Sequence, residues 1–288
     1  MQLLLMPNLS KEGVHTCVNR LTAMRFREPV AFLMDERLKG EFPGCEGVEW
    51  GPFESLIARC DACIAIGGDG TIIHSGKSAA CRHKPVLGIN LGRLGFLATL
   101  ESDQLEKLEG LLTGDYTVEE RMLLQVTLCS PDGTRQWLAM NDAVLSKGGP
   151  LTQIIELDVR CGGQPVGTYR ADGLIFSTPT GSTAYAMSAG GPIVDPAMQC
   201  ICLTPLSSHS LFSRPILFDA SGVLTACPAP GSTGKGIYLT IDGEETVPVG
   251  PGETVRFERS EIPVKLINLT GKSFTDVLNE KLIWRSRK

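Results

Sequence analysis

Three stretches of this 288-residue sequence place reactive side chains among glycines or hydroxyl residues. The first is Gly67-Gly68-Asp69-Gly70-Thr71, which directly follows an apolar run typical of a buried strand. Glycines after a strand let the backbone adopt positive φ and approach a ligand, so that main-chain N–H groups face phosphate oxygens. A carboxylate in such a turn requires a metal ion or a reacting hydroxyl group opposite it. The turn therefore predicts phosphate chemistry, with Asp69 as its reactive group.

Two common phosphate-binding motifs are excluded by the spacing. No lysine follows this turn where a P-loop requires one, and Gly88-x3-Gly92-x2-Gly95 does not fit the dinucleotide fingerprint GxGxxG. The alternative for the first stretch is a tight turn in which Asp69 helps to start a helix.

The second stretch is Asn141-Asp142, at what the pattern indicates is a strand end. An amide beside a carboxylate suits an adenine edge and a ribose diol, because a carboxylate accepts hydrogen bonds from two hydroxyl groups. A polar turn is an equally good interpretation of these two residues alone.

The third stretch runs from Asp172-Gly173 through the apolar 174–176 into hydroxyl and small residues at 177–185, and continues to 188–192. Small side chains permit close approach, hydroxyl groups and amides supply neutral hydrogen bonds, and Tyr185 offers an aromatic face to a base. The alternative, a solvated Ser/Thr loop, is disfavoured by the apolar residues that flank it.

The hydrophobic pattern of the first 115 residues alternates strands with helices. Strands are predicted at 1–7, 29–34, 62–66 and 85–90, and helices after Ser10, at 53–59, at 71–81 and from Ser102 to Gly114, with a loop at 39–52. Strands that alternate with helices imply a parallel sheet with helices on its faces. We therefore expect an α/β phosphate-binding domain over residues 1–115.

Beyond residue 115 the pattern changes to short strands separated by Gly- and Pro-rich turns. Strands are predicted at 117–129, 135–147, 154–160, 166–169, 174–177, 237–241 and 254–257. A mainly β domain over 116–269 follows, and a final helix capped by Ser273 is expected to pack, with residues 270–288, on the first domain.

Composition and charge disfavour several classes of partner and of site. The formal net charge is −5, which disfavours a general nucleic-acid or anionic-membrane binder, and no run approaches the roughly 18 apolar residues of a membrane span. The ten irregularly spaced cysteines, with no export signal ahead of them, indicate reduced thiols in a cytoplasmic protein. Cys60 and Cys63 are interpreted as small residues around a strand. The four histidines are scattered singly, and we assign no metal ligands.

The ordered set of motifs resembles that of the NAD kinase family. The resemblance rests on 67–71, on Gly88 to Leu97, on Asn141-Asp142 and on Asp172-Gly173 with 177–185; the segment 203–211 with Arg214-Pro215 is also similar. It implies an N-terminal α/β domain, a C-terminal β domain and a substrate site between them. It further implies phosphorylation of the adenosine-ribose 2′-hydroxyl of NAD, with ATP or polyphosphate as donor and a divalent metal, Mg²⁺, as cofactor.

The resemblance also implies roles for particular residues. Asp69 matches the catalytic aspartate, and Asn141 with Asp142 matches the pair that binds adenine and ribose, although many relatives have Asn-Glu there. Residues that match nucleotide-binding positions are Gly67, Gly68, Gly70, Thr71, Phe96, Asp172, Thr180, Thr183, Ala184, Tyr185 and Ser188. His209 receives no role. Family members are homo-oligomers, so a dimer or tetramer is expected.

Two other functions remain open on the sequence. The Asp69 turn also resembles that of diacylglycerol-type lipid kinases, but such an enzyme would need neither Asn141-Asp142 nor the hydroxyl-rich stretch. The other is a catalytically silent NAD(P)-binding sensor, which the intact Asp69 disfavours. The sequence does not distinguish ATP from polyphosphate as donor, nor reveal use of NADH.

Overall fold

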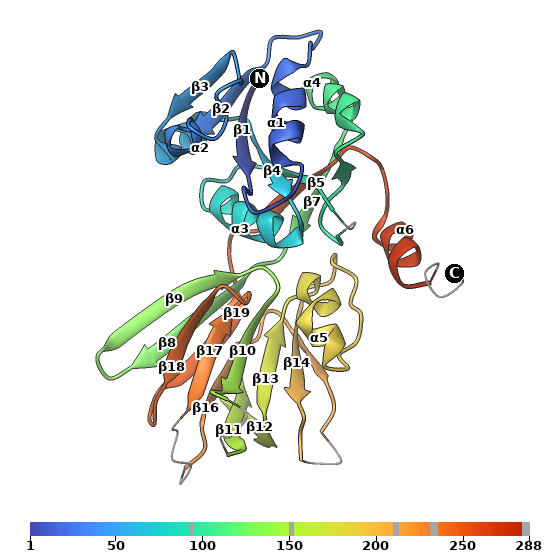
Figure 1. The fold of residues 1–288 in the computed structure, drawn as a ribbon. Coiled ribbons are helices and arrows are strands. Elements are labelled where there is room, and N and C mark those ends of the chain that lie inside the picture. Colours follow the sequence, from blue (N-terminus) through green and yellow to red (C-terminus); the bar gives the residue numbers. More distant parts are fainter. Residues whose placement is uncertain (93–94, 150–152, 210–212, 231–235, 284–288) are drawn as a thin grey trace. The chain divides into compact units, whose positions relative to one another are not determined.

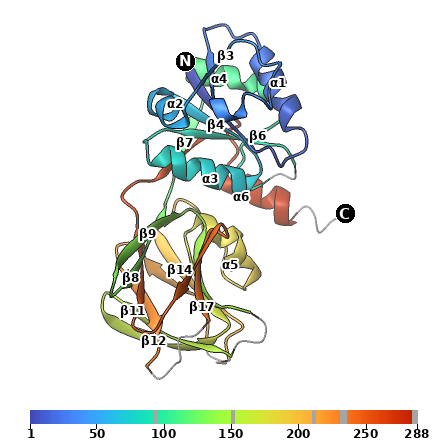
Figure 2. The same cartoon turned by 60° about the vertical axis from the view of Figure 1, so that its left-hand side comes forward.

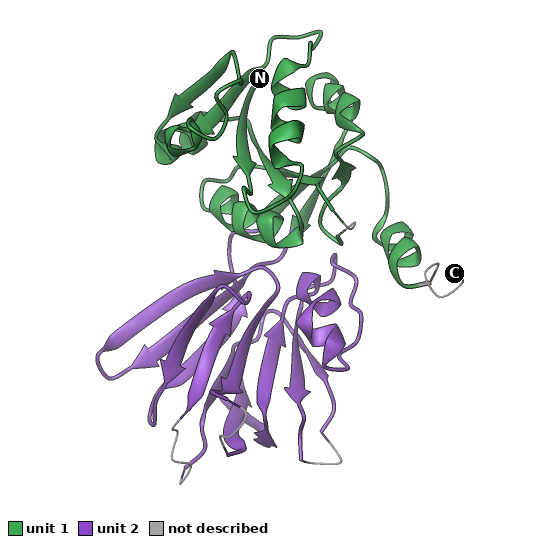
Figure 3. Cartoon of the chain, viewed as in Figure 1, with its two compact units in different colours: residues 1–120, 264–288 green, residues 121–263 purple. Residues whose placement is uncertain are grey.

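A computed structural model describes residues 1–92, 95–149, 153–209, 213–230 and 236–283. The chain divides into two compact units: unit 1 contains residues 1–120 and 264–288, and unit 2 contains residues 121–263 (Figure 3). The division lies near the expected boundaries at 115 and 269. It differs from them because a strand on each side of unit 2 belongs to the sheet of unit 1.

Unit 1 is built on one eight-stranded sheet in the order β3-β2-β1-β4-β5-β20-β7, with β6 beside β5 (Figure 1). The pairs from β3 to β20 are parallel, as the alternating pattern predicted. The strands are β1 Gln2–Pro7, β2 Ala31–Asp35, β3 Val48–Gly51, β4 Ala62–Gly67, β5 Val86–Asn90, β6 Leu100–Glu101, β7 Thr117–Arg121 and β20 Val264–Asn268. Every residue of β4 and β5 is buried, as expected of central parallel strands.

The order of connections creates a topological switch point between β1 and β4. From β1 the chain passes through α1 to β2 on one side, whereas from β4 it passes through α3 to β5 on the other. The connections therefore separate at the carboxyl ends of β1 and β4, which is where open α/β sheets bind ligands. The helices and helical turns are α1 Val14–Ala23, η1 Glu36–Leu38, α2 Phe53–Arg59, α3 Asp69–Ala80, η2 Leu105–Leu108, α4 Glu109–Thr113, α6 Phe274–Leu278 and η4 Asn279–Ile283.

Several local expectations for unit 1 are wrong in detail. Ser10 does not cap α1: the helix follows Gly13, whose φ is 79°, and the Ser10 hydroxyl donates to Asn8 Oδ1 instead. The expected loop at 39–52 contains β3, which is recruited as the edge strand beside β2. Val264–Asn268, expected in the β domain, pairs in parallel with β5.

The C-terminal helix has the expected cap but little packing. Ser273 and Asp276 form a reciprocal capping box at the start of α6. None of the residues of α6 is buried. In the segment that follows α6, the Lys281 ammonium lies 4.1 Å from the centre of the Phe96 ring.

Unit 2 is a sandwich of two six-stranded sheets, ordered β15-β14-β13-β10-β17-β18 and β12-β11-β16-β19-β8-β9 (Figure 2). The strands are β8 Leu124–Ser130, β9 Gly133–Ala139, β10 Asp142–Lys147, β11 Ile155–Cys161, β12 Gln164–Ala171, β13 Gly173–Ser177, β14 Cys200–Leu206, β15 Ile216–Asp219, β16 Leu224–Pro228, β17 Ile237–Ile241, β18 Glu245–Val249 and β19 Thr254–Arg259. All paired strands are antiparallel. The mainly β character predicted for this half is confirmed.

Alternating side chains from both sheets fill the core of unit 2. Phe176 of β13 and Phe257 of β19 stack at its centre, with ring centroids 3.8 Å apart and planes 9° apart. In the part of unit 2 that the structure describes, the helical elements are short: η3 Thr180–Thr183 and α5 Tyr185–Ser188. The strand expected over 135–147 is broken, because the chain turns between β9 and β10 at Met140 and Asn141.

Two further observations concern the whole chain. All ten cysteines are free thiols, and Cys60 and Cys63 are buried around the start of β4 with their sulfur atoms 3.9 Å apart. In the described ranges there is no helix of the length and apolarity needed to cross a membrane.

Candidate functional site

The strand β4 delivers the glycine turn to the first turn of α3. Gly67 is the last residue of β4, Gly68 is the N-cap, and Asp69 opens the helix. The expectation of positive φ is wrong, because Gly67, Gly68 and Gly70 all lie outside the left-handed region and Gly68 has φ −110°. Gly67 is required for close approach instead: a Cβ there would overlap the Thr71 hydroxyl. Since Gly68 has no side chain to cap the helix, the first N–H groups of α3 remain available to an anion.

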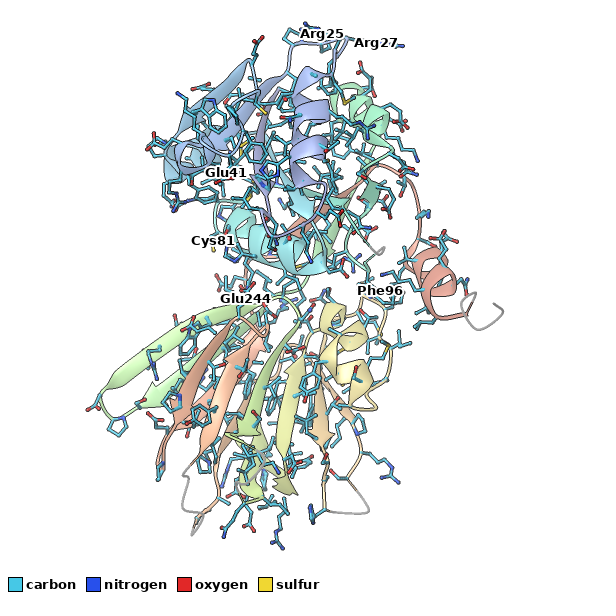
Figure 4. The ribbon with its side chains drawn as sticks, in the orientation of Figure 1. Arg25, Arg27, Glu41, Cys81, Phe96 and Glu244 are labelled. Carbon is cyan, nitrogen blue, oxygen red and sulfur yellow. The ribbon has the colours of Figure 1, made fainter. Side chains whose placement is uncertain are left out.

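Main-chain amides hold the Asp69 carboxylate. Phe96 N donates to Oδ2 at 2.7 Å and Leu97 N donates to Oδ1 at 3.3 Å. Gly95 permits this contact, because a Cβ on Gly95 would overlap the carboxylate. The second glycine turn therefore fixes the reactive side chain of the first. The half-buried Phe96 lies on this turn after β5 (Figure 4).

The loop after β1 adjoins the glycine turn, and sequence reasoning missed it. Asn8 N donates to Ile66 O at 3.0 Å, and Asn8 Nδ2 donates to the Thr71 hydroxyl at 2.9 Å. The exposed Lys11 follows, and its Cε lies 3.9 Å from the position that a Cβ on Gly68 would occupy. A cation therefore lies beside the turn at the switch point of the sheet.

Unit 2 contains a separate cavity of about 370 Å³, within the range of small-molecule sites. It opens along the outer face of β10, whose Asp142, Val144 and Ser146 point away from the core. The cavity is lined by Asn141, Asp142, Val144, Ser146, Ala184, Tyr185, Thr240, Asp242 and Gly243. Four of the residues predicted from the sequence, Asn141, Asp142, Ala184 and Tyr185, thus meet in one cavity.

The hydroxyl-rich stretch fixes the backbone of this cavity. Thr178 N donates to Asn141 O at 2.9 Å, and the Thr178 hydroxyl donates to Met140 O at 2.6 Å. Thr178 and Ser182 are fully buried, so much of this stretch is internal structure rather than ligand-facing surface. Tyr185 is 49% exposed and lines the cavity.

The Asp142 carboxyl has unusual electrostatics. The side chain is buried, and burial raises the pKa of Asp142 to about 7, with the negative charge of Asp242 adding to the rise. At neutral pH the group therefore exchanges between a carboxylate, which accepts hydrogen bonds, and a neutral acid.

The other predicted residues of unit 2 lie outside the lining of this cavity. Asp172 is at the opposite end of β13 from Ser177, where its carboxylate pairs with Lys147 Nζ at 2.6 Å. Thr180 is buried, the Thr183 hydroxyl donates to Thr180 O at 3.1 Å, and Ser188 is exposed at the end of α5. The predicted motif positions Arg93, Leu94, Ser210 and Leu211 lie outside the described residues.

Comparisons with known proteins match both units. Residues 53–116 match the ATP-NAD kinase N-terminal domain, and residues 140–269 match the ATP-NAD kinase C-terminal domain. An NAD kinase of Symbiobacterium thermophilum is 43% identical over 242 residues, covering 82% of this chain and 81% of the relative. An NAD kinase of Geobacter metallireducens is 41% identical over 236 residues, covering 81% of this chain and 82% of the relative.

Solved structures share the fold. A yeast NADH kinase complexed with NADH superposes with a TM-score of 0.88 at 23% identity, covering 100% of this chain and 89% of that chain. An NAD kinase from Archaeoglobus fulgidus in complex with ATP gives 0.67 at 24% identity, covering 99% and 98% respectively.

The raised pKa of Asp142 generates a prediction about stability. An unfolded aspartate titrates near pH 3.9, about three units below the folded group, so the free energy of unfolding falls as pH rises from about 4 to about 7. Asp142→Asn removes this contribution, and its stability relative to the wild type should rise across that window by on the order of 4 kcal/mol. Urea denaturation at pH 4.5 and 8 measures the difference. Asp132→Asn, in an exposed turn of unit 2, should show no comparable rise; a pH-independent difference for Asp142→Asn would contradict the assignment.

Proposed function

The chain belongs to the NAD kinase family, and from this premise we propose that it transfers the γ-phosphoryl group of ATP to the adenosine-ribose 2′-hydroxyl of NAD, forming NADP. The observation that carries the proposal is the cavity of unit 2, in which a buried carboxyl, an amide and an aromatic ring line one space of about 370 Å³. These groups match what an adenosine presents: a diol, a base edge and a flat ring.

Asn141 and Asp142 bind the adenosine end of NAD. The Asn141 amide both donates and accepts, as the edge of adenine requires, and the ionised Asp142 carboxylate accepts from the ribose 3′-hydroxyl, which leaves the proton of the 2′-hydroxyl to Asp69. Tyr185 packs its ring against the base. Asp142 is one carbon shorter than the glutamate of many relatives, and its position at the first residue of β10 places it in the cavity.

Asp69 orients the attacking hydroxyl group. Phosphoryl transfer passes through a loose transition state, so the nucleophile needs positioning more than early deprotonation. Two main-chain N–H groups donate hydrogen bonds to the Asp69 carboxylate and fix it in one orientation. The remaining lone pairs of the carboxylate can accept the hydroxyl proton. Asp69 therefore acts as a hydrogen-bond acceptor that takes the proton late in the reaction.

The donor is bound as its magnesium complex. Among the residues that the structure describes, no group of three His, Cys, Asp or Glu side chains is placed to hold a metal ion. Mg²⁺ typically uses one or two carboxylates together with substrate phosphates and water, so these residues suit a metal that arrives with ATP. Mg²⁺ that is bound with ATP would neutralise phosphate charge, and the uncapped N–H groups of α3 would bind phosphate oxygens.

Lys11 adds a positive charge to the donor side of the reaction. The loop that carries it is anchored through Asn8 to both β4 and the Thr71 hydroxyl, which places Lys11 against Gly68. A flexible ammonium group beside a phosphate-binding turn contacts phosphate as a point charge.

The other assignments follow the family. Gly67, Gly68, Gly70 and Thr71 form the donor turn, and Phe96, Thr180, Thr183 and Ser188 contribute to nucleotide binding. For Asp172, which pairs with Lys147 outside the lining of the cavity, the nucleotide-binding role rests on the family resemblance alone. We also propose that the protein is cytoplasmic and has no nucleic-acid or membrane partner. We further propose that it forms a homo-oligomer of two or four chains, and light scattering of the purified protein measures that number. The lipid kinase is not favoured, because the family match includes residues 140–269, which form an adenosine cavity that a lipid kinase would not need. The silent sensor is not favoured, because Asp69 is intact.

A turnover assay tests the proposed function. With NAD and Mg-ATP the protein should form NADP, whereas diacylglycerol with Mg-ATP should give no phosphorylated product. A parallel reaction with polyphosphate and NAD determines whether ATP is the sole donor. Absence of NADP with both donors would overturn the proposed function, and lipid phosphorylation would favour the lipid kinase.

The role of Asp69 predicts a selective loss of turnover. Asp69→Asn should lower kcat by roughly 10² to 10⁴, because the amide no longer accepts the hydroxyl proton, while NAD still binds. Steady-state kinetics and NAD titration measure the two effects. The exposed Asp103→Asn, also in unit 1, should retain wild-type kcat. Unchanged turnover in Asp69→Asn would disprove the assignment.

From the position of Lys11 we expect its substitution to weaken binding of the donor, ATP, and not of NAD. Lys11→Met should raise the KM for ATP by roughly tenfold, since one charge-assisted contact to phosphate is lost, and should leave the Kd for NAD unchanged. The matched control is Lys107→Met, an exposed lysine on η2. Equal KM values for ATP in both variants would remove Lys11 from the donor site.

A further inference from the structure

An aspartate outside the recognised motifs holds the adenosine-binding pair in place. The Asp242 carboxylate accepts hydrogen bonds from three consecutive main-chain amides: Met140 N at 2.9 Å, Asn141 N at 2.8 Å and Asp142 N at 3.1 Å. In return, Asp242 N donates to Asp142 O at 2.9 Å. A single side chain thus pairs the N–H groups of the whole segment 140–142.

The conformation of Asp242 is set by the turn between β17 and β18. Asp242 has φ 47° and Gly243 has φ 71°, and Glu244 N closes the turn on Ile241 O at 2.9 Å. Two successive left-handed residues are typical of type I′ turns, where Asp-Gly and Asn-Gly are favoured. An asparagine at 242 therefore fits the same backbone, which makes Asp242→Asn a conservative change.

The carbonyl groups of the same segment are held from the other side. Thr178 pairs with Met140 O and Asn141 O, and a Cβ on Gly181 would overlap Asn141 O. The segment is therefore fixed on its carbonyl side by neutral groups and on its amide side by one negative charge. Removing Asp242 would leave three half-buried N–H groups without their acceptor.

The polar and charged groups near Asp142 come from the strands and the turn that form the cavity. The lining contributed by β10, β17 and α5 carries hydroxyl groups, at Ser146, Thr240 and Tyr185, and β13 places Ser177 opposite Asp142. In the described chain no lysine or arginine lines the cavity; Lys147, at the far end of β10, pairs with Asp172. Of the two carboxylates in the turn after β17, Asp242 is in the lining of the cavity and Glu244, labelled in Figure 4, is not.

We propose that Asp242 is a positioning residue for NAD: its carboxylate fixes the main chain of Met140–Asp142, and its charge makes binding of the adenosine end depend on pH. This inference rests on the proposed function. Asp242 itself is assigned no contact with the reacting hydroxyl or with the phosphate. Its two effects act through Asp142, which binds a ribose hydroxyl most strongly when it is ionised, because hydrogen bonds to a charged acceptor are stronger than those to a neutral acid.

The direction of the pH effect follows from the two protonation states. Below about pH 7 the neutral Asp142 acid predominates, so the affinity for NAD should fall as pH is lowered. Loss of the Asp242 charge favours ionisation of Asp142, which moves the inflection to lower pH. Loss of its hydrogen bonds loosens the segment, which weakens binding even when Asp142 is fully ionised.

The test is calorimetric titration of NAD, without ATP, into the full-length protein from pH 5 to 9. The wild type should show an inflection in Kd near pH 7. In Asp242→Asn the inflection should move to lower pH, and the Kd at pH 9 should rise roughly 5- to 50-fold. Glu244→Gln removes a charge from the same turn and should retain the Kd of the wild type at pH 9. A wild-type profile in Asp242→Asn would overturn the proposal.

A second variant and an NMR measurement separate the possible failures. In Asp142→Asn, which leaves Asp242 intact, the inflection near pH 7 should disappear; its persistence would contradict the proposal. The ¹³C chemical shift of the Asp142 carboxyl, titrated without NAD, should show the lower inflection in Asp242→Asn. If that shift occurs but the wild type binds no NAD, the proposed function fails while the structural role of Asp242 stands; an unshifted titration overturns that role.

Discussion

The hydrogen bonds from main-chain amides to the Asp69 carboxylate are the constraint on which the carboxyl edge of unit 1 depends. They require the segment after β5 to approach the start of α3 so closely that residue 95 must be glycine. Glycines of both turns thus have a structural task. Gly67 admits the Thr71 hydroxyl and Gly95 admits Asp69, while the N-terminus of α3 stays uncapped. A reactive carboxylate held by rigid backbone donors needs little rearrangement before reaction.

Unit 2 uses the same device in a different fold. There the Asp242 carboxylate collects three amides of a chain turn, so that an amide and a carboxyl at the start of β10 project into one cavity. In both units a short loop is positioned by pairing its N–H groups with an aspartate from a distant part of the chain. Such pairing satisfies buried donors that loops would otherwise leave unpaired.

Local sequence signals predicted the parts of the site that lie on strand ends. The buried run 62–66 and the glycines after it predicted β4 and the start of α3, and Asn141-Asp142 with Ala184-Tyr185 meet as the motif order suggested. The sequence could not show that Val264–Asn268 joins the parallel sheet, because five apolar-alternating residues fit either sheet and the pairing partner β5 is distant. Likewise Asp242-Gly243 signals a hairpin turn, but nothing local reveals that its carboxylate reaches residue 140, 102 positions earlier. Lys11 escaped notice because its place beside Gly68 depends on the order of β1 and β4 in the sheet.

The central claim is that a ribose 2′-hydroxyl is the group that receives phosphate. The most direct measurement is ³¹P NMR of the product formed from NAD and Mg-ATP, with 2′-deoxyadenosine NAD as the comparison substrate. One new phosphomonoester, coupled to the 2′ proton of the adenosine ribose, is expected from NAD, and no product is expected from the deoxy compound. Phosphate at any other position, or turnover of the compound that lacks the 2′-hydroxyl, would contradict it.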